Sequence, residues 1–166
     1  QDNPAGDLAG ALEQPQTKHF ASVTDPAKIG DLLRAMYSYR GSPVTVAALK
    51  LAPMLFVRPG ELRKARWAEI DLGAAEWRFT ASKTGTPHIV PLPSQAIDIL
   101  EDLHPITRRS EFVFPGVRSA KRPMSENTIN KALRLMGYEG RQTGHGFRHL
   151  LSTELNGRGY NRDWIE

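Results

Sequence analysis

The sequence predicts an α+β fold that is mainly helical and carries a small antiparallel β-sheet. Apolar residues recur with helical spacing along most of the chain, and after Trp67 the spacing changes to that of a β-hairpin. With 166 residues, of which 40% are apolar and 24% charged, the chain has the size and composition of one globular domain with a sizeable core.

Capping residues and prolines mark the first helices. The first helix is capped by Thr24 or Asp25 and runs to about residue 40. The second covers residues 42–56 and is apolar almost all round, so it should be central, with a kink at Pro53. A short helix over residues 59–65 follows directly.

The remaining elements alternate between short strands and helices. Residues 76–81 and 88–91 are predicted to be antiparallel strands joined by a turn at 82–86. The later elements are expected to be a helix over 93–103, a short buried strand over 111–114, a helix over 125–136, a helix over 144–156 and a last helix capped by Asn161.

The beginning of the chain differs from the rest. Residues 1–18 are rich in Pro, Gly and Ala and show no period, so they are expected to be an interdomain linker. The domain itself is expected to cover residues 19–166. Because the first residue is Gln1 rather than Met, we expect the chain to be a piece of a longer protein.

The chain is basic, with a net charge of +4 and a pI of about 9.6. Residues 1–57 are neutral overall, so the whole excess lies in residues 58–166. This distribution suits a polyanion such as nucleic acid, although it is also compatible with an ordinary solvated surface. The basic residues expected to contact DNA phosphates are Arg118, Lys121, Arg122, Lys131 and Arg134.

Some functional classes are excluded by composition. The chain has no cysteine, which rules out disulfides, Cys-ligated zinc and thiol catalysis within it. Its most apolar stretch, residues 44–57, is too short to span a bilayer and contains Lys50 and Pro53. No membrane association is therefore expected.

A predicted helix N-terminus carries the most informative short motif, His145-Gly-Phe-Arg148. The i,i+3 spacing places both side chains on one face, and the partial positive charge of the helix N-terminus favours an anion. Arginine binds phosphate oxygens bidentately and stays charged at any working pH. The alternative is a capped helix with a surface histidine and arginine.

Two upstream residues could complete an anion site. Arg58 ends a long apolar run, so it either forms a structural ion pair with Glu61 or points into a polar site, and Glu61 could serve both arrangements. Lys83 lies at the predicted hairpin turn, where it could donate a proton to a leaving oxygen or could simply be solvated.

In order along the chain, five segments resemble the catalytic domain of tyrosine recombinases, and most closely the phage integrases of prophages and genomic islands. The resemblance covers residues 20–166. Besides Lys83 in the hairpin, the matching segments are Arg58-Pro-Gly-Glu-Leu-Arg with Trp67-Ala-Glu-Ile-Asp-Leu, His88-Ile-Val-Pro-Leu, Arg122-Pro-Met-Ser-Glu-Asn and Gly144-His-Gly-Phe-Arg.

The resemblance implies a mechanism. A tyrosine, expected beyond Glu166, attacks the scissile DNA phosphate and forms a 3′-phosphotyrosine. Arg58 and Arg148 clamp the phosphate oxygens, His145 hydrogen-bonds the phosphate or helps to move a proton, and Lys83 protonates the leaving 5′-oxygen. Neither a metal nor another cofactor is expected, because the arginines supply the positive charge.

The resemblance also implies partners and a location. The full-length protein would act on double-stranded DNA attachment sites as a homotetramer in the bacterial cytoplasm, at the nucleoid. A DNA core-binding domain would precede the linker. The fragment itself would be monomeric, would bind DNA and would be inactive without the nucleophile.

Two other functions remain open from the sequence. One is a DNA-binding integrase remnant without catalysis, which would bind DNA in a salt-dependent manner and form no adduct. The other is a metal-independent nuclease that uses His145 as base and Lys83 as acid, which would release hydrolysed DNA without a protein–DNA bond.

Overall fold

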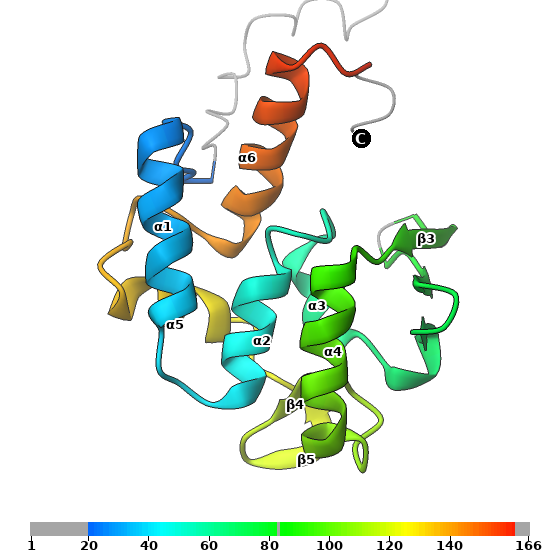
Figure 1. Ribbon diagram of the computed structural model, residues 1–166. Coiled ribbons are helices and arrows are strands. Elements are labelled where there is room, and N and C mark those ends of the chain that lie inside the picture. The colour runs from blue at the N-terminus through cyan, green and yellow to red at the C-terminus, as the bar shows by residue number, and fades with distance from the viewer. Residues whose placement is uncertain (1–19, 83, 162–166) are drawn as a thin grey trace, which may run out of the picture.

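Helices are the main regular elements of the computed structural model, which describes residues 20–82 and 84–161 (Figure 1). In chain order the elements are α1 (Pro26–Ser38), α2 (Pro43–Leu51), α3 (Pro59–Lys64), the 3₁₀ turn η2 (Trp67–Glu69), β1 (Ile70–Asp71), β2 (Glu76–Thr80), β3 (Pro87–Pro91), α4 (Ser94–Thr107), β4 (Pro115–Gly116), β5 (Ser119–Pro123), α5 (Thr128–Leu135) and α6 (Gly144–Gly157). The predicted mainly helical α+β class is confirmed. The predicted linker over residues 1–18 and the helix expected after Asn161 lie outside the described residues.

The first helices begin where capping rules place them. Asp25 accepts a hydrogen bond from the Ala27 N–H at 3.1 Å, and the Ser42 hydroxyl accepts one from the Thr45 N–H at 3.3 Å. Proline occupies the first position of α1, α2 and α3, where its missing N–H costs nothing.

Helix α2 ends earlier than predicted. We expected it to continue to residue 56 with a kink at Pro53, but it stops at Leu51 and the chain passes through a turn. The kink prediction was wrong because proline lacks an N–H for the helical ladder and disfavours helical geometry in the residue before it. Phe56 then adopts a left-handed backbone conformation with φ of 51°, which redirects the chain into α3.

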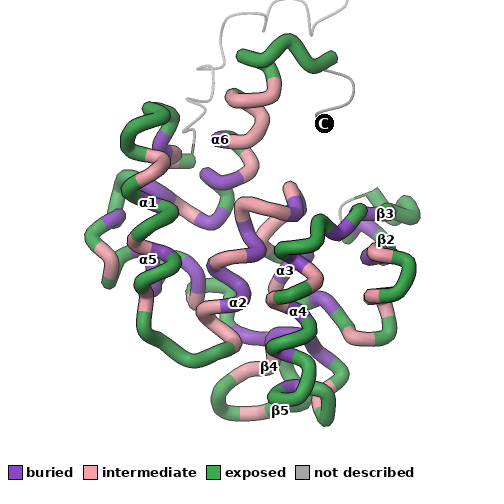
Figure 2. The backbone as a smooth tube through the Cα atoms, in the orientation of Figure 1, coloured by how far each residue is buried: buried purple, intermediate pink, exposed green. Residues whose placement is uncertain are grey.

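The core surrounds α2, as its nearly uniform apolar character predicts. Ala48, Leu49 and Leu51 are fully buried, and α2 packs against α1, α4 and α5. Figure 2 shows buried residues concentrated in these central helices, whereas the second half of α6 is intermediate or exposed. Only the first half of α6 is therefore anchored by described core residues, among them Phe147.

The β-structure consists of two small antiparallel sheets. Strands β1, β2 and β3 form the first in that order, and Trp77 on β2 faces Val90 on β3, both buried. This sheet lies at the side of the molecule away from α1 (Figure 1). The second sheet pairs β4 with β5. It places the basic residues of β5 on a surface hairpin.

Three further elements differ from prediction. Residues 111–114 do not form a strand beyond a single bridge from Phe112 to Arg66; they run irregularly through the core with Val113 and Phe114 buried. Helix α4 extends to Thr107, because Pro105 lies in its last turn and interrupts little of the ladder. Helix α5 begins at Thr128, after a turn, rather than at residue 125.

Among the described residues, no helix is long and apolar enough to cross a membrane.

Candidate functional site

A cleft of about 460 Å³ lies where α3, α5 and the start of α6 meet. It contains two of the predicted site residues, Arg58 and His145, together with Glu61. The residues that line it are Phe20, Arg58, Pro59, Gly60, Glu61, Arg63, Lys64, Ser82, Glu126, Asn127, Ile129, Asn130, Gly144 and His145. Segments more than 80 residues apart in the sequence thus form one positively charged concavity.

Arg58 is held at the cleft by Glu61. The Arg58 backbone N–H donates to Glu61 Oε2 at 2.9 Å, and its Nη1 donates to Glu61 Oε1 at 3.2 Å. The Glu61 side chain is 5% exposed, whereas that of Arg58 is 38% exposed. The structural ion pair considered from the sequence is therefore present, and it fixes a guanidinium that still reaches the cleft surface.

His145 lies in the first turn of α6. Thr143 caps this helix by accepting a hydrogen bond from the Gly146 N–H at 3.0 Å. One face of the imidazole is covered by the Phe20 ring, with centroids 4.4 Å apart and planes 16° apart. Desolvation by this partial burial lowers the pKa of His145 below its ordinary value of 6.5.

Arg148 lies one turn further along α6 and is fixed to the segment that carries Arg58. Its Nη1 donates to the Phe56 carbonyl at 2.8 Å, and its guanidinium carbon lies 4.5 Å from the centre of the Phe56 ring. Arg148 is not one of the residues that line the cleft. Phe56 nevertheless precedes Arg58 by two positions. The turn at Phe56 therefore both binds Arg148 and leads the chain into Arg58.

Lys83 lies outside the described residues. Its neighbour Ser82 lines the cleft.

Two residues at the cleft were missed from the sequence. Asn130 on α5 accepts a hydrogen bond from the Gly144 N–H at 2.9 Å and so ties α5 to the start of α6. Phe20 covers His145 from a segment 125 positions earlier in the chain. Neither lies in a recognisable motif; each contact arises from packing between distant segments.

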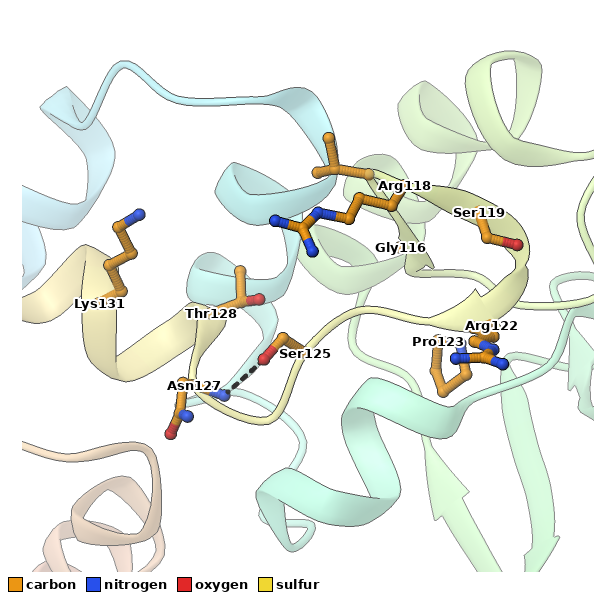
Figure 3. Close-up of a pocket in the computed structure, with 10 residues that line it drawn as sticks. Gly116, Arg118, Ser119, Arg122, Pro123, Ser125, Asn127, Thr128 and Lys131 are labelled. Atoms are coloured by element: carbon orange, nitrogen blue, oxygen red, sulfur yellow. Dashed lines mark hydrogen bonds between the residues drawn. The ribbon is translucent and has the colours of Figure 1, made fainter.

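A larger basic pocket of about 800 Å³ lies beside the cleft, between the β4–β5 hairpin and α5. Arg118, Arg122 and Lys131 line it, and Figure 3 shows the Arg118 side chain directed from the hairpin toward α5. Of the other residues predicted to bind DNA, Lys121 is exposed on β5 outside the pocket, and Arg134 lines a neighbouring hollow together with Lys131.

The cleft and the basic pocket adjoin each other. Asn127 lines both, and it also lines the hollow that contains Arg134. A polyanion lying along α5 could therefore contact both regions at once. Within residues 20–82 and 84–161, no group of three or more His, Asp or Glu side chains is arranged to hold a metal ion.

Sequence comparison identifies the family. The sequence pattern of the phage integrase family matches residues 23–166, which is most of the chain. The chain belongs to the phage integrase family. It is 38% identical to the integrase of enterobacteria phage P4 over 99% of its own length and 41% of that protein. It is 39% identical to the prophage integrase IntZ of Escherichia coli K12, with 99% and 41% covered. This family member thus spans less than half the length of these curated relatives.

Solved structures support the same fold. The XerA recombinase superposes with a TM-score of 0.69 at 19% identity, covering 95% of this chain and 59% of that one. A lambda integrase tetramer bound to a Holliday junction superposes with a TM-score of 0.65 at 17% identity, covering 96% and 52%. At these identities the likeness shows the fold, so the tyrosine-recombinase catalytic fold predicted from the sequence is confirmed.

Proposed function

We propose that the longer protein to which this domain belongs carries out site-specific DNA recombination, the integration or excision of a prophage or genomic island, by cleaving and rejoining DNA through a 3′-phosphotyrosine. The observation that carries the proposal is the convergence of Arg58, His145 and Arg148. Arg58 and His145 line one cleft, and Arg148 binds the chain reversal from which Arg58 extends.

The chemistry follows from these groups. Arg58 and Arg148 would neutralise the non-bridging oxygens of the scissile phosphate as charge develops on them. His145 would hydrogen-bond the phosphate or accept a proton. Lys83 would protonate the leaving 5′-oxygen, and the nucleophile would be a tyrosine that follows residue 166 in the longer protein.

The basic pocket would hold the flanking DNA. Its Arg118, Arg122 and Lys131 are arranged along the hairpin and α5, next to the cleft. Contacts from such residues to phosphates fix the register of the duplex without reading its sequence. Lys121 and Arg134 would extend the same contacts on either side.

The longer protein would assemble on its DNA. The lambda integrase neighbour is a tetramer on a Holliday junction, which supports a homotetramer of the full-length protein on attachment-site DNA. This chain alone would be a monomer that binds DNA without cleaving it. The protein would work in the bacterial cytoplasm at the nucleoid.

The test is covalent adduct formation by the full-length protein on a nicked attachment-site duplex. Wild type should give a denaturant-resistant protein–DNA adduct, and Arg148→Ala should abolish it. Arg109→Ala is the matched control, because Arg109 is an exposed arginine that does not line the cleft. Undiminished adduct with Arg148→Ala would refute the assignment.

The same assay separates the two other functions. A DNA-binding remnant would shift the duplex in a salt-dependent manner and give no adduct with the wild-type protein. A nuclease using His145 and Lys83 would release cleaved DNA that is free of protein.

A further inference from the structure

The segment that enters the domain lies over the start of α6. Phe20 belongs to this segment and lines the cleft together with Arg58. The residue is 58% exposed, although burying a large apolar side chain is favourable. The face that is covered lies against His145, in a nearly parallel stack.

Hydrogen bonds fasten the next three residues to the same helix start. The Ala21 carbonyl accepts from the Thr143 backbone N–H at 3.1 Å and from the Thr143 hydroxyl at 3.3 Å. The Ser22 hydroxyl donates to the Gly146 carbonyl at 2.9 Å. The Val23 N–H donates to the buried side chain of Gln142 at 2.8 Å.

A glycine in α6, Gly146, lets the entering segment pass close to the helix. A Cβ atom at this position would lie against the Ala21 carbonyl oxygen, far inside van der Waals contact. A glycine is therefore needed for the entering segment to approach α6 closely enough to place Phe20 on His145.

We propose that Phe20 is a positioning residue for His145: its ring fixes the plane of the imidazole at the mouth of the Arg58 cleft and keeps water off one face. The inference deepens the proposed function, on which its catalytic meaning rests. The lowered pKa of His145 agrees with this cover. A neutral imidazole can accept a proton as well as donate a hydrogen bond, whereas an imidazolium can only donate.

Charged neighbours of both signs surround the imidazole. The charged groups that line the cleft with His145 are Arg58, Glu61, Arg63, Lys64 and Glu126, and Arg148 and His149 follow it along α6. The cations disfavour protonation of His145 and the carboxylates favour it. Removal of Phe20 leaves all of these groups in place, so it isolates the effect of the aromatic cover.

The test is an NMR pH titration of His145 in this 166-residue chain, with the resonance assigned by its loss in His145→Gln. In Phe20→Ala the pKa of His145 should rise toward 6.5, because the ring becomes hydrated on both faces. Its ring-proton resonance should also move downfield as the shielding by the stacked ring is lost. Phe20→Tyr should restore both values. Tyr37→Ala removes an aromatic ring of similar exposure outside the cleft and should change neither.

An unchanged pKa and chemical shift in Phe20→Ala would overturn the proposal, as would a change that Phe20→Tyr does not rescue. If Phe20→Ala unfolds, Phe20→Leu decides instead. Leucine keeps apolar bulk over the imidazole, so the pKa should change little while the ring-proton resonance moves downfield, and an unmoved resonance would overturn the proposal. The adduct assay tests the proposed function separately. A full-length wild-type protein that forms no adduct at any pH would refute recombination, while the titration would still decide for or against Phe20.

Discussion

Replacing Gly146 by alanine should detach the entering segment from α6. The added Cβ would overlap the Ala21 carbonyl oxygen, a backbone atom that can yield only if the whole segment moves. Three hydrogen bonds between the entering segment and α6 depend on its present position. Two run from Thr143 to the Ala21 carbonyl, and one runs from Ser22 to the Gly146 carbonyl.

The magnitude follows from these contacts. Three hydrogen bonds at about 1 kcal/mol each give a loss of about 3 kcal/mol. Alanine is better than glycine inside a helix by about 1 kcal/mol, which offsets part of that loss. We therefore expect Gly146→Ala to lower the free energy of unfolding by about 2 kcal/mol, on the basis of these hydrogen-bond and helix-propensity values. For a chain of this size the corresponding fall in Tm is about 4–8 °C.

Urea denaturation followed by circular dichroism measures this difference. The matched control is Gly157→Ala at the other end of α6, where a Cβ would meet nothing within 4 Å. That variant should be as stable as wild type or slightly more stable, because only helix propensity changes. If Gly146→Ala is as stable as Gly157→Ala, the contact between the entering segment and α6 does not contribute as argued.

Three other outcomes are expected. Glu61→Gln should lower the free energy of unfolding by about 1–2 kcal/mol, because it weakens a charged hydrogen bond to Arg58 and the exposure of Arg58 reduces the effect. An unchanged urea midpoint would contradict this. The pKa of His145 is lower in the folded than in the unfolded chain. Its contribution to stability is therefore present above pH 6.5 and is lost as the pH falls through the folded pKa. In thermal melts at pH 5 to 7, His145→Gln should reduce the dependence of Tm on pH. Arg118→Ala should reduce the salt slope of DNA binding by about 0.9, measured by fluorescence anisotropy, whereas Arg109→Ala should leave the slope unchanged.

Local sequence signals predicted much of the fold correctly. Asp25, one of the two predicted caps, caps α1; the second helix starts at Ser42 as predicted, and the apolar run of α2 is central. These features depend on residues within one or two turns of each other, so the sequence determines them locally. The strands at β2 and β3 were predicted for the same reason, because the turn between them is short.

The errors share a different cause. The apolar residues 112–114 suggested a strand over 111–114, but they form an irregular buried segment with a single bridge from Phe112 to Arg66. Only tertiary packing specifies that arrangement. The role of Pro53 was also misjudged, since a proline can either kink a helix or end it, and the fold decides which. At the site, the roles of Arg58, Lys83, His145 and Arg148 remain predictions, while Phe20 could not be found because its contact spans 125 positions.

The chain reversal at Phe56 explains how the two arginines come to act together. A left-handed conformation at a non-glycine residue costs about 1–2 kcal/mol. Two contacts of the Arg148 guanidinium offset this cost. It donates a hydrogen bond to the Phe56 carbonyl and lies over the Phe56 ring. A charged hydrogen bond and a partly exposed cation–π contact together contribute about 2 kcal/mol or more, which is enough to stabilise the turn. The same turn leads into the α3 cap, where Glu61 fixes Arg58. Both arginines are therefore anchored at or directly after this reversal, Arg148 by its contacts with Phe56 and Arg58 by its contacts with Glu61.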